Sequence, residues 1–193
     1  CSLIPTGTLL ACSFDTELVQ EVYSAIGAEM KDRGSDVLLA PGMNIHRNPL
    51  CGRNFEYYSE DPLLSGKIAA AAVRGIQSRG VSACIKHFAC NNQEFARTVN
   101  DSRVSERALR QIYLKGFEIC IKEAKPQNIM TSYNKINGVY SYFNYDLCTS
   151  VLRGEWGYAG NVMTDWLTKK CKSPEYGTIR NQAYSVLSLI NIL

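Results

Sequence analysis

The sequence contains no apolar run close to the roughly 20 residues that a membrane-spanning helix requires. Its most apolar stretch, residues 183–193, is too short and is broken by polar residues. The 21 lysines and arginines are spread along the chain beside 18 acidic residues, so the clustered basic stripe that binds a phosphate backbone is missing too. We therefore expect a soluble protein with neither a membrane nor a nucleic acid as partner.

No two cysteines have the Cys-x-x-Cys spacing typical of metal and redox sites, although the chain has eight cysteines. They lie mainly among apolar residues at wide, irregular intervals: Cys1, Cys12, Cys51, Cys84, Cys90, Cys120, Cys148 and Cys171. We expect most of them to be buried free thiols in a reducing compartment, with disulfides or metal ligation as the alternatives. We therefore expect no metal and no cofactor, and the free thiols favour a cytoplasmic location.

The sequence begins abruptly at Cys1, with neither an initiator methionine nor a secretion signal. This start suggests a fragment or a processed chain. Internal repeats, low-complexity stretches and Pro-, Gly- or Ser-rich linkers are absent as well, so one domain is the default. With 46% apolar and 20% charged residues, the chain has the composition of a globular protein with a substantial core.

Short apolar runs alternate with longer stretches of helical period, the pattern of repeated βα units and a mostly parallel sheet. Four runs bounded by Gly, Pro or Asn predict buried strands at residues 37–40, 82–88, 128–133 and 161–165.

The intervening stretches predict three helices. One starts at Asp15 and runs to about residue 33. A second has Asp61 as its N-cap and Pro62 in its first turn, and it ends before Gly80. The third covers residues 105–123, because apolar residues recur there at i, i+3, i+4 and i+7.

Four strands do not close a barrel, and a complete eightfold barrel typically needs about 250 residues. We therefore expect an α/β fold, a partial (β/α)8 TIM-type barrel that is incomplete at both ends. An open, doubly wound parallel sheet is the alternative.

The predicted strands run into unusually polar residues at their carboxyl ends, where parallel βα folds place their reactive groups. The candidate site residues are Arg53, Lys86, His87, Tyr133, Asp165 and Trp166. Cations, a carboxylate and aromatic rings facing one space suit a sugar, because hydroxyls need donors and acceptors and the C–H face of a pyranose packs on aromatic rings.

Each of these residues also has a structural interpretation when taken alone. Lys86 and His87 could cap strand carbonyls, and Asp165 could be the N-cap of a following helix. Arg53 could belong to a surface ion-pair cluster with Glu56, Glu60 and Asp61. A barrel lysine could form a Schiff base as in an aldolase, but that use of Lys86 leaves Asp165 and Trp166 unexplained.

Five motifs, in order, match one known family. They are LAPGMNIHRNP (39–49), GRNFEYYSEDP (52–62), IKHFACNNQE (85–94), MTSYN (130–134) and VMTDW (162–166). From about residue 5 to residue 166 the chain resembles the N-terminal barrel of glycoside hydrolase family 3, in its β-glucosidase-like branch.

The resemblance implies retaining hydrolysis of terminal non-reducing β-D-glucosyl residues, with small β-glucosides or oligosaccharides as substrates. It implies that Asp165 is the nucleophile and that Arg53, Lys86 and His87 bind sugar hydroxyls. It also implies that Tyr133 lies close to the nucleophile and that Trp166 lines the same subsite. The two cations should favour the ionised form of Asp165. The lack of a Pro-Gly-His stretch after His87 argues against N-acetylglucosaminide substrates.

The sequence departs from the family pattern at three places. The opening Asp-Gly-Pro strand is missing, as is the acid/base glutamate associated with a sandwich domain that normally completes the site. Residues 167–193 do not align, so we expect a partial barrel over residues 1–166 followed by a divergent tail of unclear fold from a truncated or rearranged gene. We expect a glycoside hydrolase by descent with little or no activity in this chain alone. The alternative is a non-catalytic or vestigial carbohydrate-binding fragment.

Overall fold

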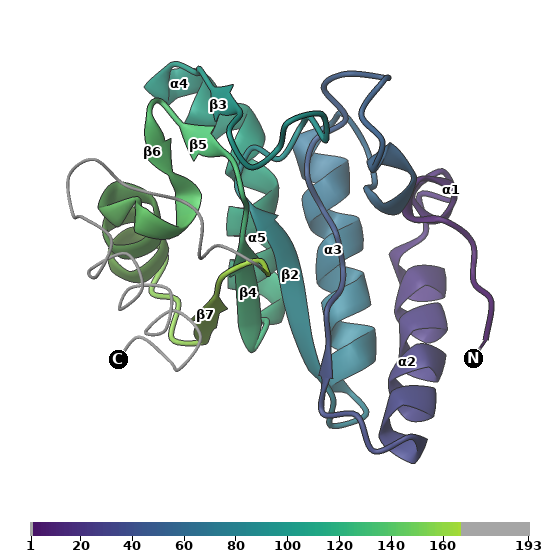
Figure 1. Cartoon of the computed structure of the whole chain (residues 1–193). Helices are drawn as coiled ribbons and strands as arrows, with labels where there is room; N and C mark the ends of the chain where they lie inside the picture. Colours follow the sequence, from purple (N-terminus) through teal and green to yellow (C-terminus); the bar gives the residue numbers. More distant parts are fainter. Residues whose placement is uncertain (1, 167–193) are drawn as a thin grey trace.

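The computed structural model describes residues 2–166, which form a parallel sheet covered by helices (Figure 1). The sheet contains β1 (Val37–Leu38), β2 (Ser82–Phe88), β4 (Asn128–Thr131) and β7 (Asn161–Met163), in that spatial order. Every neighbouring pair is parallel. The four predicted strands are therefore confirmed, and their sequential order fits a barrel segment, since a doubly wound sheet reverses its order at a switch point.

Helices α2 (Thr16–Asp32) and α3 (Pro62–Gln77) begin where the sequence predicted. The Asp15 side chain accepts hydrogen bonds from the backbone N–H groups of Glu17 and Leu18, and Asp61 accepts one from Leu64 at 2.7 Å. The short helix α1 (Gly7–Ala11), which was not predicted, precedes them. Helix α3 packs against α2 on one side and against α5 (Lys115–Ala124) on the other (Figure 1).

The third predicted helix is not one regular α-helix. It begins as α4 (Glu106–Ala108), continues as the π-helical turn η2 (Leu109–Tyr113) and becomes α-helical again in α5. A π turn takes up an extra residue, so it rotates the apolar face relative to a continuous 3.6-residue period. Ile112, which the period placed on the buried stripe, is 38% exposed, whereas Leu114, which lay off that stripe, is 2% exposed.

Several short elements carry no periodic signal and were not predicted. They are the small sheet β3 (Asp101–Ser102), β5 (Lys135–Ile136) and β6 (Val139–Tyr140), the 3-10 turns η1 (Asn54–Glu56) and η3 (Ser141–Phe143), and the π-helix η4 (Asp146–Glu155). Strands of two residues are too short to show the alternation that reveals a strand in sequence.

The core lies between the sheet and the helices. Phe88 on β2 contacts Phe117 on α5 and Trp156 edge to face, with ring centroids 5.2 and 5.9 Å apart. Within the described part of the chain the cysteines are free thiols, of which Cys51, Cys84, Cys90 and Cys120 are buried and Cys12 is exposed. Cys1, Cys171 and the expected divergent tail lie outside the described residues.

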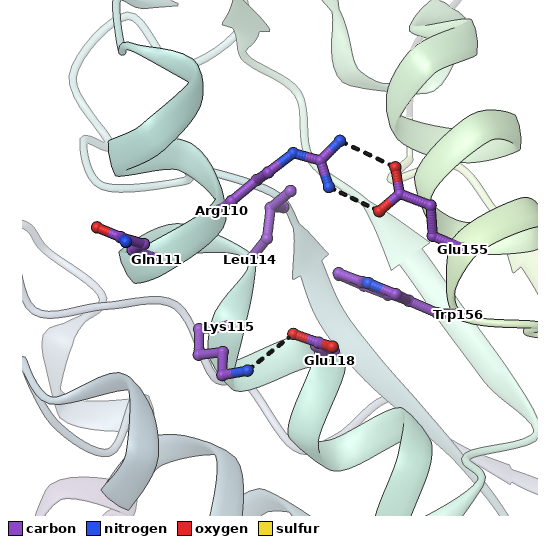
Figure 2. A pocket seen from close by; sticks show the side chains of 7 residues that line it. All are labelled: Arg110, Gln111, Leu114, Lys115, Glu118, Glu155 and Trp156. Carbon is purple, nitrogen blue, oxygen red and sulfur yellow. Dashed lines mark hydrogen bonds and ion pairs between the residues drawn. The ribbon is translucent and has the colours of Figure 1, made fainter.

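A hollow of about 440 Å³ lies between η2, α5 and the end of η4 (Figure 2). Its charged groups are paired with one another: Arg110 donates to both carboxylate oxygens of Glu155 at 2.6 and 2.9 Å, and Lys115 donates to Glu118 at 3.0 Å. The Arg110–Glu155 pair ties η2 to η4 across the hollow, whereas the Lys115–Glu118 pair lies within α5. None of the helices in residues 2–166 has the length and apolar character needed to cross a lipid bilayer.

Candidate active site

The carboxyl ends of the parallel strands bring the predicted site residues together. Lys86 and His87 are the fifth and sixth residues of β2, and Asp165 follows β7. The His87 Nε2 atom lies 3.9 Å from Asp165 Oδ2. Arg53 immediately precedes η1, and its charge and that of Lys86 both act on the Asp165 carboxyl. The predicted convergence of a carboxylate, an imidazole and two cations is therefore present.

Asp165 is a buried carboxyl, 8% exposed. The backbone N–H of Trp166 donates to its Oδ1 atom at 2.8 Å. Burial raises the Asp165 pKa above its usual value, and this effect exceeds the opposing effects of the Trp166 N–H and of Arg53, Arg97 and Lys86. Arg53 and Lys86 thus favour the ionised form of Asp165, as expected, but desolvation of the carboxylate is the larger effect.

Tyr133 and Trp166 meet through a side chain and a backbone group. The Tyr133 hydroxyl donates to the carbonyl oxygen of Trp166. The Tyr133 pKa is raised, mainly by burial and to a smaller extent by the negative charge of Asp165. The Trp166 side chain is exposed, at 67%. Among the described residues, Trp166 therefore contacts Tyr133 and Asp165 through its backbone carbonyl and N–H groups and not through its indole ring.

Glu56, which sequence reasoning did not assign to the site, joins its two cations. Arg53 Nε donates to Glu56 Oε1, and Lys86 Nζ lies 3.8 Å from Glu56 Oε2. The Arg53 side chain is only 21% exposed, and Asp61 caps α3 instead of pairing with it. The Arg53–Glu56 pair of the ion-pair alternative is therefore present, but it is largely shielded from solvent and Asp61 does not take part in it.

A second pair of residues missed by sequence reasoning, Glu94 and Arg97, extends this network. Glu94 accepts a hydrogen bond from Arg97 Nη1 at 2.9 Å and lies 4.0 Å from Arg53 Nε. The guanidinium of Arg97 stacks over the Tyr133 ring, 4.8 Å from its centroid. Glu94 ends a recognised motif and could have been found from it, whereas Arg97 follows in a loop without any periodic or motif signal.

His87 is 2% exposed and is held on both its backbone and its ring. The Asn44 side chain donates to the His87 carbonyl at 2.9 Å and accepts from the His87 N–H at 2.8 Å. The Tyr57 hydroxyl lies 3.2 Å from His87 Nδ1. Among the described residues the ring therefore contacts a side chain and Lys86 pairs with Glu56, which favours a role in the site over the capping alternative.

Burial lowers the pKa of His87 well below its usual value, and the charges of Arg53, Lys86 and Arg97 lower it further. The imidazole at the site is therefore neutral at physiological pH. Within residues 2–166, no three His, Cys, Asp or Glu side chains are grouped so that they could hold a metal ion.

The Glycosyl hydrolase family 3 N terminal domain matches residues 1–191 of the chain. A beta-glucosidase of Ruminococcus albus is 53% identical over 163 residues, which are 84% of this chain and 17% of that protein. An exo-alpha-(1->6)-L-arabinopyranosidase of Bifidobacterium breve is 51% identical over 162 residues, 84% of this chain and 21% of that protein.

A solved structure gives the same picture of the fold. The beta-glucosidase 3B of Thermotoga neapolitana, in complex with glucose, is 59% identical, with a TM-score of 0.85, over 86% of this chain and 23% of that one. The chain thus spans 17% to 23% of the length of these three proteins. The match over almost all of its residues shows that the chain belongs to glycosyl hydrolase family 3, as part of the N-terminal (β/α)8 barrel domain.

Proposed function

We propose that this chain carries the nucleophile half of the active site of a retaining β-glycosidase that hydrolyses terminal non-reducing β-D-glucosyl residues. The observation that supports this most directly is the buried Asp165 carboxyl, 3.9 Å from the neutral imidazole of His87 and within the field of Arg53, Lys86 and Arg97. A parallel barrel has no structural need for this grouping of charges at its strand ends.

In the proposed reaction the Asp165 carboxylate attacks the anomeric carbon of the sugar through an oxocarbenium-like transition state. The new C–O bond gives a covalent glycosyl-enzyme as the bond to the leaving oxygen breaks. A second carboxyl, about 5–5.5 Å away in retaining enzymes, protonates that oxygen and then takes a proton from the water that releases the sugar. The raised pKa of Asp165 means that the nucleophile ionises at a higher pH than an ordinary aspartate.

The other site residues would hold the sugar. Arg53 and Lys86 are donors only, so they suit hydroxyl oxygens, and His87 presents its Nε2 atom toward the same space. The exposed Trp166 indole, like the Tyr133 ring, could pack on the C–H face of a pyranose. Small β-glucosides and oligosaccharides are the proposed substrates.

The acid/base carboxyl is proposed to come from a further domain, as the much greater length of the relatives suggests. Glu56 and Glu94 are each salt-bridged to cations of the site, an arrangement suited to holding those cations. Loss of general acid catalysis typically costs about 10²–10⁴-fold, so this chain alone should turn over unactivated glucosides very slowly.

Rates of aryl β-glucoside hydrolysis test the proposal. The wild-type chain and Asp165→Asn are compared on substrates whose leaving groups differ in acidity. A dinitrophenolate leaving group needs no protonation, so we expect the wild type to release it measurably from dinitrophenyl β-glucoside. We expect slower release of nitrophenol from nitrophenyl β-glucoside, and no release from either substrate by Asp165→Asn. Equal rates for the two proteins would remove the catalytic claim. Saturable glucose binding without any release would support the non-catalytic carbohydrate-binding alternative, and aryl arabinosides in the same assay would test the choice of sugar.

A further inference from the structure

A continuous run of hydrogen bonds leads from Glu94 to the imidazole beside Asp165. Asn91 Nδ2 donates to Glu94 Oε1 at 3.0 Å and to the Tyr57 hydroxyl at 2.8 Å. The Tyr57 hydroxyl in turn lies 3.2 Å from His87 Nδ1, and His87 Nε2 faces Asp165. Tyr57 is fully buried and His87 and Asn91 are nearly so, which keeps competing water away from these bonds.

The direction of each bond follows from the carboxylate at the start of the run. An ionised carboxylate can only accept, so it fixes the Asn91 amide with its NH2 group toward Glu94 and Tyr57. Glu94 is itself held by Arg97 at 2.9 Å. The Tyr57 oxygen therefore accepts one hydrogen bond from Asn91, and its own proton is directed to the remaining neighbour, His87 Nδ1.

The other side of the ring favours the same arrangement. If Nδ1 carried the proton of the neutral ring, the Nε2 lone pair would face the Asp165 carboxyl at 3.9 Å. When Asp165 is ionised, a lone pair directed at a carboxylate is repulsive, whereas an N–H directed at it is attractive. Tyr57 on one side and Asp165 on the other thus both favour an acceptor at Nδ1 and a donor at Nε2.

From this geometry we infer that Tyr57 is a positioning residue that fixes His87 as the Nε2–H tautomer. The separation of 3.9 Å exceeds a direct hydrogen bond, so the Nε2–H group is left available for a hydroxyl that contacts both the imidazole and the carboxyl from one side. Its use on a sugar hydroxyl rests on the proposed function, but the tautomer itself does not. Burial supports the assignment, because it lowers the pKa of His87 and raises that of Tyr57, leaving both neutral.

Nitrogen-15 NMR of the full chain labelled at histidine tests this directly, because the sequence has only two histidines. A protonated ring nitrogen has a pyrrole-type shift and an unprotonated one a pyridine-type shift, so each tautomer is read without reference to activity. His46, whose Nε2 lies 2.8 Å from the Asn54 carbonyl oxygen, serves as an internal reference, and His46→Gln assigns the remaining signals to His87. We expect pyrrole-type Nε2 and pyridine-type Nδ1 for His87 at neutral pH.

Two matched variants separate a tautomer effect from a packing effect. Tyr57→Phe keeps the ring and removes the donor to Nδ1, so we expect about a tenfold rise in the ratio of the Nδ1–H to the Nε2–H form. Tyr58→Phe removes the neighbouring buried hydroxyl, which donates to Tyr23 at 3.2 Å, and should leave the His87 signals unchanged. An Nδ1–H tautomer in the wild type, or an unchanged His87 spectrum in Tyr57→Phe, would overturn the inference, and neither result depends on sugar binding or hydrolysis.

Discussion

His87 Nε2 lies 3.9 Å from Asp165 Oδ2 even though strand β4 separates the strands that lead to them. In a flat sheet, strands that are two apart lie roughly 9–10 Å from each other. The side chain of His87 and the carboxyl of Asp165, which follows the end of β7, together span this distance. The parallel order of β2, β4 and β7 thus brings the imidazole and the proposed nucleophile to the same edge of the sheet.

Glu56→Gln should weaken sugar binding. The substitution removes the negative charge that both Arg53 and Lys86 contact, so the two donors lose their common anchor. The groups are partly shielded from water, and we expect roughly a tenfold increase in the dissociation constant for glucose measured by calorimetry. Glu60→Gln, an exposed site in the same motif, is the control. Unchanged affinity in Glu56→Gln would show that the anchor is not needed.

Asp165→Asn should stabilise the chain at neutral pH. Burial raises the folded-state pKa of Asp165 above its usual value of 3.8, so folding favours the protonated carboxyl and the folded state loses stability as pH rises through that pKa. An amide avoids this loss and keeps the acceptor for the Trp166 N–H. We expect a melting temperature higher by a few degrees at pH 7.

The sign of this effect is checked by repeating the melts toward pH 3, where the wild-type carboxyl is protonated and the difference between the two proteins should shrink. Asp36→Asn, at an exposed carboxyl, controls for the loss of one negative charge. A variant less stable than wild type at neutral pH would contradict the assignment of desolvation as the dominant effect on Asp165.

Gly75→Ala should destabilise the packing of α3 on α2. A Cβ atom there would overlap the Gln20 carbonyl oxygen and lie 2.9 Å from Ser24 N, both backbone atoms of α2. We expect a loss of about 1–3 kcal/mol in the free energy of unfolding by urea, despite the better helix propensity of alanine. Gly154→Ala, whose Cβ would have Thr149 O at 3.6 Å as its nearest neighbour, should be tolerated. Similar stabilities for the two variants would be incompatible with the close approach of these helices.

The sheet and the helix starts could be predicted because their signals are local. Apolar runs mark buried strands, and Asp15 and Asp61 mark helix N-termini whatever packs around them. The π turn at Leu109–Tyr113 could not be predicted, since its sequence is compatible with a regular helix and the extra residue depends on packing against the rest of the fold.

The candidate site was predictable in outline but not in its connections. Residues at strand ends are brought together by the parallel topology alone, which is why Lys86, His87 and Asp165 were found. Arg97 reaches Tyr133 and Glu94 from a loop whose path sequence does not specify. The balance of burial against charge at Asp165 likewise depends on depth below the surface, which motifs do not encode.

The central claim is that Asp165 is a nucleophile, and covalent trapping tests it without requiring the acid/base carboxyl. A 2-deoxy-2-fluoro-β-glucoside with a dinitrophenyl leaving group slows both chemical steps but supplies a leaving group that needs no proton, so the glycosyl-enzyme should accumulate. Peptide mass spectrometry should then find one fluoroglucosyl group on the peptide that contains Asp165, and none in Asp165→Asn. A label on Glu56 or Glu94 instead, or no label on a chain that binds glucose, would contradict the account.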